Sequence, residues 1–360
     1  MVGFQVTGSK ATQWIAIAAL VGVNALWGLS FPIMKSLNLQ MEQFFGLEND
    51  LVPSTVSIAF SSGMIGLRFL MSLVVLCLFC PSLVRSASQT EWLAGIMVGL
   101  FFYVGLVLQV IGLATIPASR SGFLTSLTAV FTPVFSALLF RKSVSYNVVL
   151  GVAIALMGVA LLTGLVVIDA AGIAVAPNAI AKWTVGDSLT TFGAVLFTVQ
   201  ILLIDHYGKR LNTTAITPGM FLAVALAAVL TFTALHSVAL TSMPVHAAQA
   251  WQTWSKLFLS PLFLGIVLFL AVVCSVLAFL GMNTYQPRIT AVQASIIYSS
   301  EPVFASIWAL FLPGLLGTFE NTIGYPNEII SVPLFVGGSF VLLANVVSLW
   351  PRRSESVLSD

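Results

Sequence analysis

The chain has 360 residues, of which 59% are hydrophobic and only 7% are charged, and its mean hydropathy is +1.05. A water-soluble domain carries roughly 25% charged residues, so this composition excludes a soluble globular protein and favours one surrounded by lipid. The formal net charge of +2, without a run of basic residues, gives no indication of nucleic-acid binding.

Long apolar runs predict ten membrane-spanning helices, because each crossing of the hydrocarbon core needs roughly 20 apolar residues. The runs are continuous rather than alternating, which excludes an all-β protein. The first run is too long for a cleaved signal peptide and has a counterpart in the second half, so we expect it to remain. We therefore predict an all-α polytopic membrane protein. The predicted spans are residues 13–34, 58–80, 92–115, 121–140, 146–167, 187–206, 217–236, 260–283, 289–311 and 330–350.

The lysine and arginine residues between the spans predict the direction of the chain, because cytoplasmic connections carry an excess of them. With the N-terminus inside, only Lys35, Arg120, Lys182 and Lys256 fall on the outer side. The cytoplasmic side then holds Lys10, Arg85, Arg141, Lys142, Lys209, Arg210, Arg288, Arg352 and Arg353. We expect both termini in the cytoplasm, residues 352–360 as a tail, and the protein in the plasma membrane, a bacterial inner membrane.

One long apolar segment occurs twice in the chain. Residues 104–135 overlay residues 273–304 without a gap, at an offset of 169 residues. The most specific matches are Gly112 with Gly281, Thr115 with Thr284, Ser126 with Ser295, and Pro133 with Pro302. Five spans per half is an odd number, so the second half enters the membrane in the opposite direction. We predict two inverted five-helix repeats, residues 1–168 and 185–351, an arrangement found in many transporters.

Three outer connections are longer than those common in compact domains. They cover residues 35–56, 244–258 and 314–329. Apolar and acidic residues alternate in 35–56, which is typical of a short amphipathic helix on the membrane surface. Two interpretations stay open for these segments: an inert connector, or a lid or partner site.

Residues that commonly bind metals or catalyse reactions are scattered. Cys77 and Cys80 form a C-x-x-C pair inside an unbroken apolar run, where free cysteines are usually simply buried. His206, His236 and His246 lie near span ends and are not grouped. We therefore predict no metal site, no other cofactor and no catalytic residues, since an intramembrane enzyme needs a clustered metal set or a nucleophile with its base.

Several different short motifs occur in the first, second, fourth and ninth predicted spans. The clearest is Ala294–Ala305 in the ninth span. The others are Ala25–Phe31, Arg68-Phe69, Ser121–Leu124 and Thr132–Phe135. In order and spacing these motifs resemble those of EamA-type transporters in the drug/metabolite transporter superfamily. The resemblance implies ten helices in two EamA-like halves, a central cavity, and transport of small organic metabolites.

Polar and aromatic side chains inside the spans are candidates for the substrate pathway, because polar groups are costly in lipid. Each has a competing interpretation, since it could instead pack against another helix or bond its own backbone. The candidates are Trp27, Tyr103, Gln109, Thr125, Thr128, Gln200, Asn283, Gln293, Tyr298 and Glu301.

Glu301 is the sharpest of these candidates, because it lies near the middle of the ninth span. An unpaired carboxyl group there needs a proton, a cation or hydrogen-bond donors. It could couple transport to protons or contact a substrate ammonium group, or it could form a hydrogen bond that packs two helices. Arg68, about ten residues into the second span, also needs a partner, and both Glu301 and Asp187 are candidates.

Three prolines within the spans, Pro32, Pro133 and Pro302, are candidates for helix kinks that take part in gating. Proline removes a backbone hydrogen bond and kinks a helix. A kink that only improves packing is an equally good interpretation.

These features favour a secondary transporter that moves small organic metabolites, such as amino acids or related compounds, by alternating access. The chain has no G-x-x-x-x-G-K-[ST] loop for ATP, so the energy source is a gradient, with proton coupling as one candidate, or exchange. The alternative is a channel or a non-transporting receptor or scaffold, although no filter sequence or ring of charges appears. The expected partners are the bilayer and a small organic substrate, and the chain could act as a monomer or a homodimer.

Overall fold

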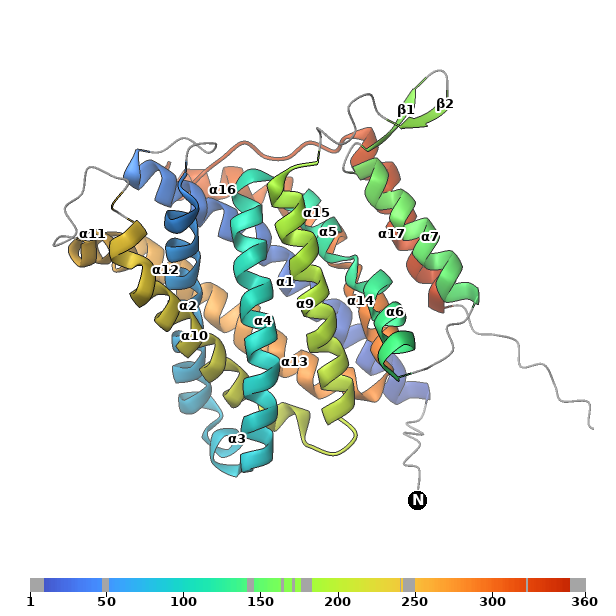
Figure 1. Cartoon of the computed structure of the whole chain (residues 1–360), viewed down its shortest axis with the longest axis horizontal. Coiled ribbons are helices and arrows are strands. Elements are labelled where there is room, and N and C mark those ends of the chain that lie inside the picture. The colour runs from blue at the N-terminus through green and yellow to red at the C-terminus, as the bar shows by residue number, and fades with distance from the viewer. Residues whose placement is uncertain are drawn as a thin grey trace, which may run out of the picture.

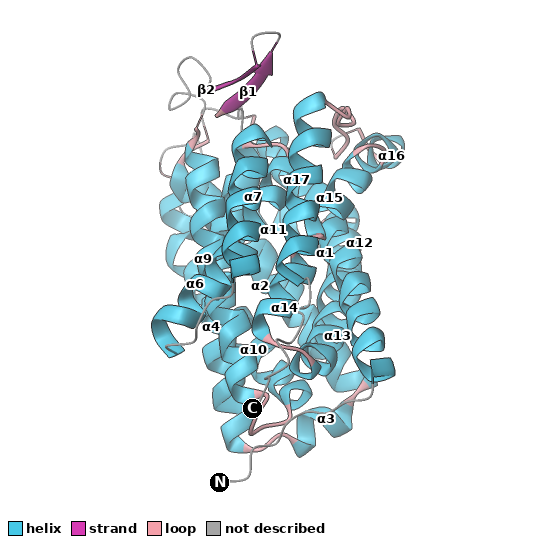
Figure 2. Cartoon of the chain, turned by 90° about the vertical axis from the view of Figure 1, so that its right-hand side faces the viewer, coloured by secondary structure: helices cyan, strands magenta, loops and turns pink. Residues whose placement is uncertain are grey.

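Long apolar helices make up most of the chain in the computed structural model. Seven of the described helices are long and apolar enough to cross a membrane, and an eighth crossing results if Ala291–Ala309 and Leu312–Phe319, which meet at a 48° bend, form one span. The long helices run side by side in one bundle (Figure 1, Figure 2). The prediction of a multi-pass membrane protein is confirmed. The structure describes residues 10–46, 52–140, 146–162, 165–169, 172–175, 183–239, 241, 250–321 and 323–349.

The described residues of the first half of the chain are mostly helical and end in one hairpin. Its helices are α1 (Lys10–Phe45), α2 (Ser54–Phe79), α3 (Pro81–Ser86), α4 (Gln89–Thr115), α5 (Ala118–Thr125), α6 (Thr128–Phe140) and α7 (Tyr146–Leu162). The strands β1 (Val166–Asp169) and β2 (Gly172–Val175) pair antiparallel, with Val166 opposite Val175. The prediction of helix up to residue 167 is therefore wrong at its end. The β-branched run Val166–Ile168 fits an extended chain better than a helix.

The second half contains shorter helical pieces. They are α9 (Val185–Tyr207), η2 (Thr213–Ile216), α10 (Thr217–Ala239), α11 (Ala250–Phe258), α12 (Pro261–Phe269), η4 (Leu270–Leu277), α13 (Ala278–Tyr285), η5 (Gln286–Arg288), α14 (Ala291–Tyr298), α15 (Glu301–Ala309), α16 (Leu312–Phe319) and α17 (Val332–Leu349). The segment η4 is a π-helical stretch that joins α12 to α13 without a break. Such wider turns often occur at functional sites.

The three long connections that were predicted on the outer side contain more helix than expected. In the first, α1 continues through Pro32 to Phe45, with Leu37 and Met41 buried. The expected separate surface helix is therefore wrong for residues 35–45, and residues 47–51 lie outside the described part. In the other two connections α11 covers residues 250–258 and α16 ends at Phe319, while residues 242–249 are not described.

Small residues let several helices approach closely. A Cβ at Gly193 of α9 would lie 2.9 Å from the backbone oxygen of Gly105 in α4. A Cβ at Gly158 of α7 would lie 2.7 Å from the backbone oxygen of Gly337 in α17. Helix association in membranes depends on such contacts. The α7–α17 pair stands at one edge of the molecule (Figure 1), whereas α2 packs on α10 at the other side.

Aromatic rings from four helices form the centre of the core. Phe69, Phe102, Phe221 and Phe279 come from α2, α4, α10 and α13, and all four are at least 92% buried. The Phe102 and Phe279 rings meet edge to face at 4.9 Å, and the Phe69 and Phe221 rings at 5.3 Å. Edge-to-face contacts are favourable for aromatic rings. This cluster is a packed wall beside the cavity described next.

Candidate functional site

A cavity with a water-accessible volume of about 70 Å³ lies in the interior, where both halves of the chain contribute side chains. It is bounded by α1, α2, α4, α5 and α6 from the first half and by α9, α13, α14 and α15 from the second. Its lining residues are Trp27, Ser30, Arg68, Phe102, Leu106, Gln109, Thr125, Thr128, Phe197, Gln200, Ile201, Phe279, Met282, Tyr298 and Glu301.

Eight of the residues singled out in the sequence are together in this lining: Trp27, Arg68, Gln109, Thr125, Thr128, Gln200, Tyr298 and Glu301. The other lining residues, which are apolar except for Ser30, were missed, because apolar side chains at a cavity cannot be distinguished from lipid-facing ones by type. Helical spacing was the available signal for several of them. Phe102, Leu106 and Gln109 follow one face of α4, and Phe197, Gln200 and Ile201 follow one face of α9.

Three predicted pathway residues lie outside the cavity lining. The Tyr103 hydroxyl is paired with Ser62 Oγ at 3.1 Å. Asn283 donates to Thr217 Oγ1 at 2.9 Å and therefore holds α13 against α10. Gln293 is exposed and forms the capping box of α14 with Thr290. Each side chain thus has a local structural role in this conformation.

Two helix breaks flank the cavity. The first separates α5 from α6 at residues 126–127, next to Thr125 and Thr128, and the second separates α14 from α15 at residues 299–300, next to Tyr298 and Glu301. Pro302 lies in the first turn of α15, where its missing N–H is tolerated. Pro133 and Pro32 instead lie inside the unbroken helices α6 and α1.

Asn24, which the sequence interpretation overlooked, supports the second break. This residue of α1 is completely buried. Its Nδ2 donates to the Ile297 backbone oxygen at 2.7 Å and to Ser300 Oγ at 3.1 Å. The same backbone oxygen also accepts from Ser300 N at 3.0 Å and from Ser300 Oγ at 2.7 Å, so Asn24 adds a tertiary contact from α1 to a break that already has local hydrogen bonds. Asn24 lies one turn before Trp27 on α1, and that spacing was a usable signal.

Glu301 is the first residue of α15 and is 91% buried. The N-terminus of a helix favours a negative group. Within the described part of the chain, its carboxyl group makes no hydrogen bond or ion pair. The neighbouring Tyr298 is held in place, because its hydroxyl donates to Gln286 Oε1 at 2.9 Å and its ring lies 5.5 Å from that of Trp27. A buried carboxyl group without a protein partner either keeps its proton or pairs with a group inside the cavity.

Arg68 is 97% buried and is held by η4. Its Nε donates to Ser275 Oγ at 2.8 Å, and Nη2 donates to the Cys274 backbone oxygen at 3.1 Å. Its Nη1 faces Met34 Sδ at 3.6 Å. The expected ion pair with Glu301 or Asp187 is not formed among the described residues, because η4 supplies backbone and hydroxyl acceptors instead. Arg68 and Glu301 thus both line the cavity without pairing with each other.

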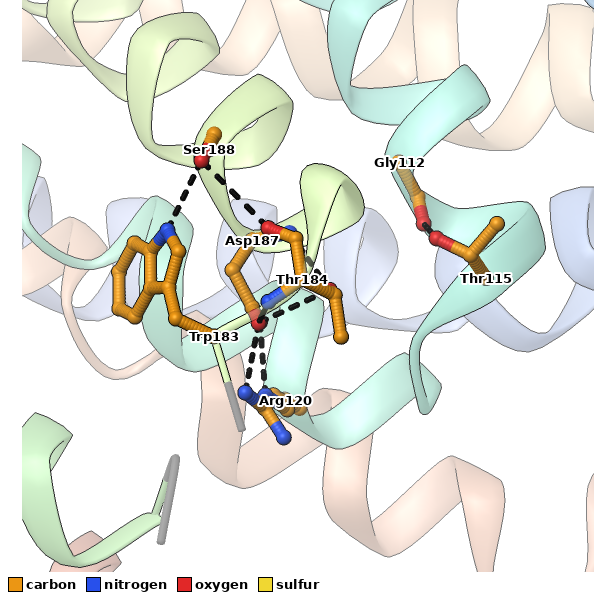
Figure 3. A network of polar contacts seen from close by, with 7 residues as sticks. All are labelled: Gly112, Thr115, Arg120, Trp183, Thr184, Asp187 and Ser188. Carbon is orange, nitrogen blue, oxygen red and sulfur yellow. Dashed lines mark hydrogen bonds and ion pairs between the residues drawn. The ribbon is translucent and has the colours of Figure 1, made fainter. Parts of the chain in front are cut away.

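Asp187 pairs with Arg120 at the ends of α9 and α5 (Figure 3). The guanidinium group donates from Nε to Oδ1 at 2.7 Å and from Nη2 to Oδ2 at 2.6 Å. The same carboxylate accepts from Thr184 N at 2.7 Å, which completes the capping box of α9. Trp183 donates to Ser188 Oγ at 2.8 Å beside it. Bidentate pairs of this kind are strong and specific in geometry.

A second set of contacts holds the same end of α5. Glu328, from the segment between α16 and α17, accepts from Ala118 N at 2.8 Å, and Lys35 of α1 donates to the Ile116 backbone oxygen at 2.8 Å. The Lys35 ammonium group also lies 5.8 Å from the centre of the Tyr325 ring. Burial raises the pKa of Tyr325 well above its usual range, and the Glu328 carboxylate adds to the rise. Both halves therefore meet at the start of α5.

Comparisons with known proteins agree with the predicted resemblance. Residues 51–164 match the EamA-like transporter family. An uncharacterized transporter of Archaeoglobus fulgidus is 23% identical over 325 residues, which cover 90% of this chain and 82% of that protein. A solved structure described only as "Crystal structure of protein" has a TM-score of 0.47 and 18% identity, and the match covers 89% of this chain and 96% of that one. The first two matches confirm the resemblance to EamA-type transporters.

Proposed function

We propose that this EamA-type membrane transporter moves small organic metabolites, such as amino acids or related compounds, across the plasma membrane by alternating access. The observation that carries the proposal is the pair of charged residues in the cavity. Arg68 and Glu301 both line it, and the two do not pair with each other among the described residues. A solute with a carboxylate and an ammonium group would complement both.

The donors and acceptors of the cavity suit such a solute. A guanidinium group has five N–H donors, and the three contacts of Arg68 leave two of them for a carboxylate. The Nε2 group of Gln200 is a further buried donor with no partner among the described residues. Glu301 provides the acceptor for an ammonium group, with the Trp27 and Tyr298 rings beside it. A zwitterion bound this way would leave neither buried charge unpaired.

The small volume of the cavity supports a site whose walls move apart when a solute binds. About 70 Å³ is less than half of the roughly 150 Å³ that an engineered apolar cavity in another protein uses to bind benzene. An amino acid therefore needs the walls to separate. The breaks at residues 126–127 and 299–300 divide the two helical segments that flank the cavity, and rigid pieces on either side of a break can rotate.

Packing between the halves supports two inverted five-helix repeats, residues 1–168 and 185–351, with ten membrane helices in all. The duplicated segments fall on α4–α6 and on η4–α15. Helices at matching positions pair with each other, α2 with α10 and α7 with α17. Two shorter apolar helices, Val149–Gly158 and Val332–Ala344, would complete the count. Charge distribution supports both termini in the cytoplasm, and Glu301 is the candidate for proton coupling, with exchange as the alternative.

Substrate flux in proteoliposomes tests this proposal. The purified protein would be screened with a panel of labelled amino acids and other small metabolites, with and without a pH gradient. We expect saturable flux for at least one zwitterionic solute and its loss in Arg68→Gln. Gln293→Ala is the matched control, because Gln293 is a polar residue of the same region that lies outside the cavity. Absence of flux for the whole panel, or equal loss in the control, would contradict the proposal.

A further inference from the structure

A second, larger cavity lies away from the substrate cavity, between α2, α10 and α11. Its water-accessible volume is about 300 Å³. These helices stand at the edge of the molecule opposite the α7–α17 pair (Figure 1). The lining residues are Gly63, Leu67, Leu70, Val229, Phe232, Thr233, Trp251, Trp254, Ser255, Phe258 and Leu259. None of them lines the substrate cavity.

This second cavity, called the groove below, has few polar groups in its walls that are free to bind a ligand. The Thr233 hydroxyl donates to the Leu230 backbone oxygen at 3.0 Å. The Ser255 hydroxyl donates to the Gln252 backbone oxygen at 2.9 Å. Trp254 Nε1 donates to the His236 backbone oxygen at 3.0 Å. Because these groups are already bonded within the protein, a polar ligand would lose its own hydrogen bonds on entry. An apolar occupant is favoured instead.

The base of the groove is a preformed aromatic surface. The Trp254 and Phe258 rings stack at 5.6 Å, and Phe232 meets Trp254 edge to face at 5.7 Å. Phe258 can take this place because Gly63 lacks a side chain: a Cβ there would lie only 2.5 Å from the Phe258 ring. Trp254 is 1% exposed, whereas Leu70, Trp251 and Leu259 at the rim are 40% to 63% exposed. The groove thus opens onto the apolar outer surface of the helix bundle.

The helix α11 places this opening at the edge of the bilayer. Trp254 and Leu257 are buried on one face, while Gln252 and Lys256 are exposed on the other. A helix of this kind lies in the interface, with its basic side chain reaching the headgroups. Membrane hydrocarbon is therefore the apolar material next to the groove.

We propose that the groove between α2, α10 and α11 binds an acyl chain of a bilayer phospholipid. An apolar cavity of roughly 150 Å³ stays free of water and takes up benzene, and this groove has about twice that volume. Leaving it empty would cost the dispersion contacts of its walls. The bound chain would wedge the α2–α10 pair against α11.

Photolabelling tests this proposal on the full-length protein. The protein would be reconstituted in phosphatidylethanolamine and phosphatidylglycerol vesicles that contain a phospholipid with a diazirine in the middle of one acyl chain. After irradiation, adducts would be located by peptide mass spectrometry. We expect adducts on Trp254 and Phe258, which lipid reaches only through the groove. Adducts confined to outward-facing residues such as Leu138, which is 73% exposed, would overturn the proposal.

A matched pair of substitutions on α10 gives the second readout. Val229→Trp fills the groove from its rim and should lower Trp254 labelling several-fold. Leu226 lies one turn away, is 51% exposed and does not line the groove, so Leu226→Trp should leave the labelling of Trp254 unchanged. Persistent labelling in Val229→Trp, an equal fall in Leu226→Trp, or a crosslink to a second copy in place of lipid would each contradict the proposal. Arg68→Gln should not alter the labelling, so this test is independent of transport.

Discussion

Arg120 and Asp187 join the first half of the chain to the second through two hydrogen bonds of 2.7 Å and 2.6 Å between their side chains. Arg120 lies in the first turn of α5, and α5 ends at Thr125, which lines the cavity and accepts a hydrogen bond from Gln109 Nε2. The short helix α5 thus connects the ion pair to the cavity. If the halves separate at this end of α5, this pair must break together with the contacts of Lys35 and Glu328.

Removing one partner of this pair should destabilise the protein. The Asp187 side chain is fully buried and that of Arg120 is 19% exposed, so Asp187→Asn removes the charge of a carboxylate that a largely buried guanidinium group contacts. Such losses cost roughly 3–5 kcal/mol, and the partial exposure of Arg120 favours the lower end. Thermal unfolding in detergent would measure the change. The exposed pair Lys209–Asp205 is the control, since Lys209→Gln should cost less than about 1 kcal/mol. Equal effects of the two substitutions would contradict a buried pair.

The proposed coupling role of Glu301 predicts that one substitution separates two transport activities. Glu301→Gln keeps the size of the side chain and removes its ability to exchange a proton. We expect it to abolish uptake driven by a pH gradient while exchange of substrate across the membrane stays measurable. Both activities would be followed in the same proteoliposomes. An unchanged pH dependence of uptake would contradict a coupling role for Glu301.

Asn24 should matter for the break between α14 and α15. Asn24→Ala removes two hydrogen bonds between α1 and the break, to the Ile297 backbone oxygen and to Ser300 Oγ, which should reduce the free energy of unfolding by roughly 1–3 kcal/mol. Ser300→Ala removes the 3.1 Å contact and the bond from its own hydroxyl to the Ile297 oxygen, but that oxygen keeps its bonds from Asn24 Nδ2 and Ser300 N, so the effect should be smaller. Thermal unfolding of both variants would show which substitution destabilises the protein more. If Ser300→Ala is the more damaging one, the support of the break does not come from Asn24.

Tyr325 predicts a loss of stability at alkaline pH. Burial and the Glu328 carboxylate raise its pKa in the folded state above the value near 10 of an exposed tyrosine. A raised folded pKa contributes stability below the unfolded pKa, and this contribution is lost as pH rises above about 10. Tyr325→Phe should therefore flatten the alkaline fall of the melting temperature, whereas Tyr146→Phe, at a 71% exposed residue, should not. The same alkaline slope in wild type and Tyr325→Phe would refute this.

Orientation can be tested with single cysteines in a background that lacks Cys77 and Cys80. A cysteine in place of Glu320, an exposed residue after α16, should react with an impermeant thiol reagent added to whole cells. A cysteine in place of Lys209, an exposed residue after α9, should react only after the cells are opened. Reversed labelling would overturn the predicted direction of the chain.

The sequence predicted the helices well where apolar runs were long, and failed where polar residues occurred within a helix. The predicted first span ends at residue 34, but α1 continues to Phe45, and Lys35 inside it donates to the Ile116 backbone oxygen. Likewise, Arg68 was expected to pair with an acid, and instead η4 supplies its acceptors. Each partner is more than 80 residues away in the chain, so no local pattern could indicate it.

Sequence alone determined that this chain spans a membrane as helices, because in lipid each segment must satisfy its own backbone hydrogen bonds and the length of an apolar run is a local property. It also indicated most of the polar residues that line the cavity. Only the tertiary structure decided that Arg68 and Glu301 remain unpaired with each other, that Asp187 belongs to Arg120, and that Tyr103, Asn283 and Gln293 lie outside the cavity lining. Those outcomes depend on which faces of distant helices meet, and side-chain spacing along one helix does not specify that.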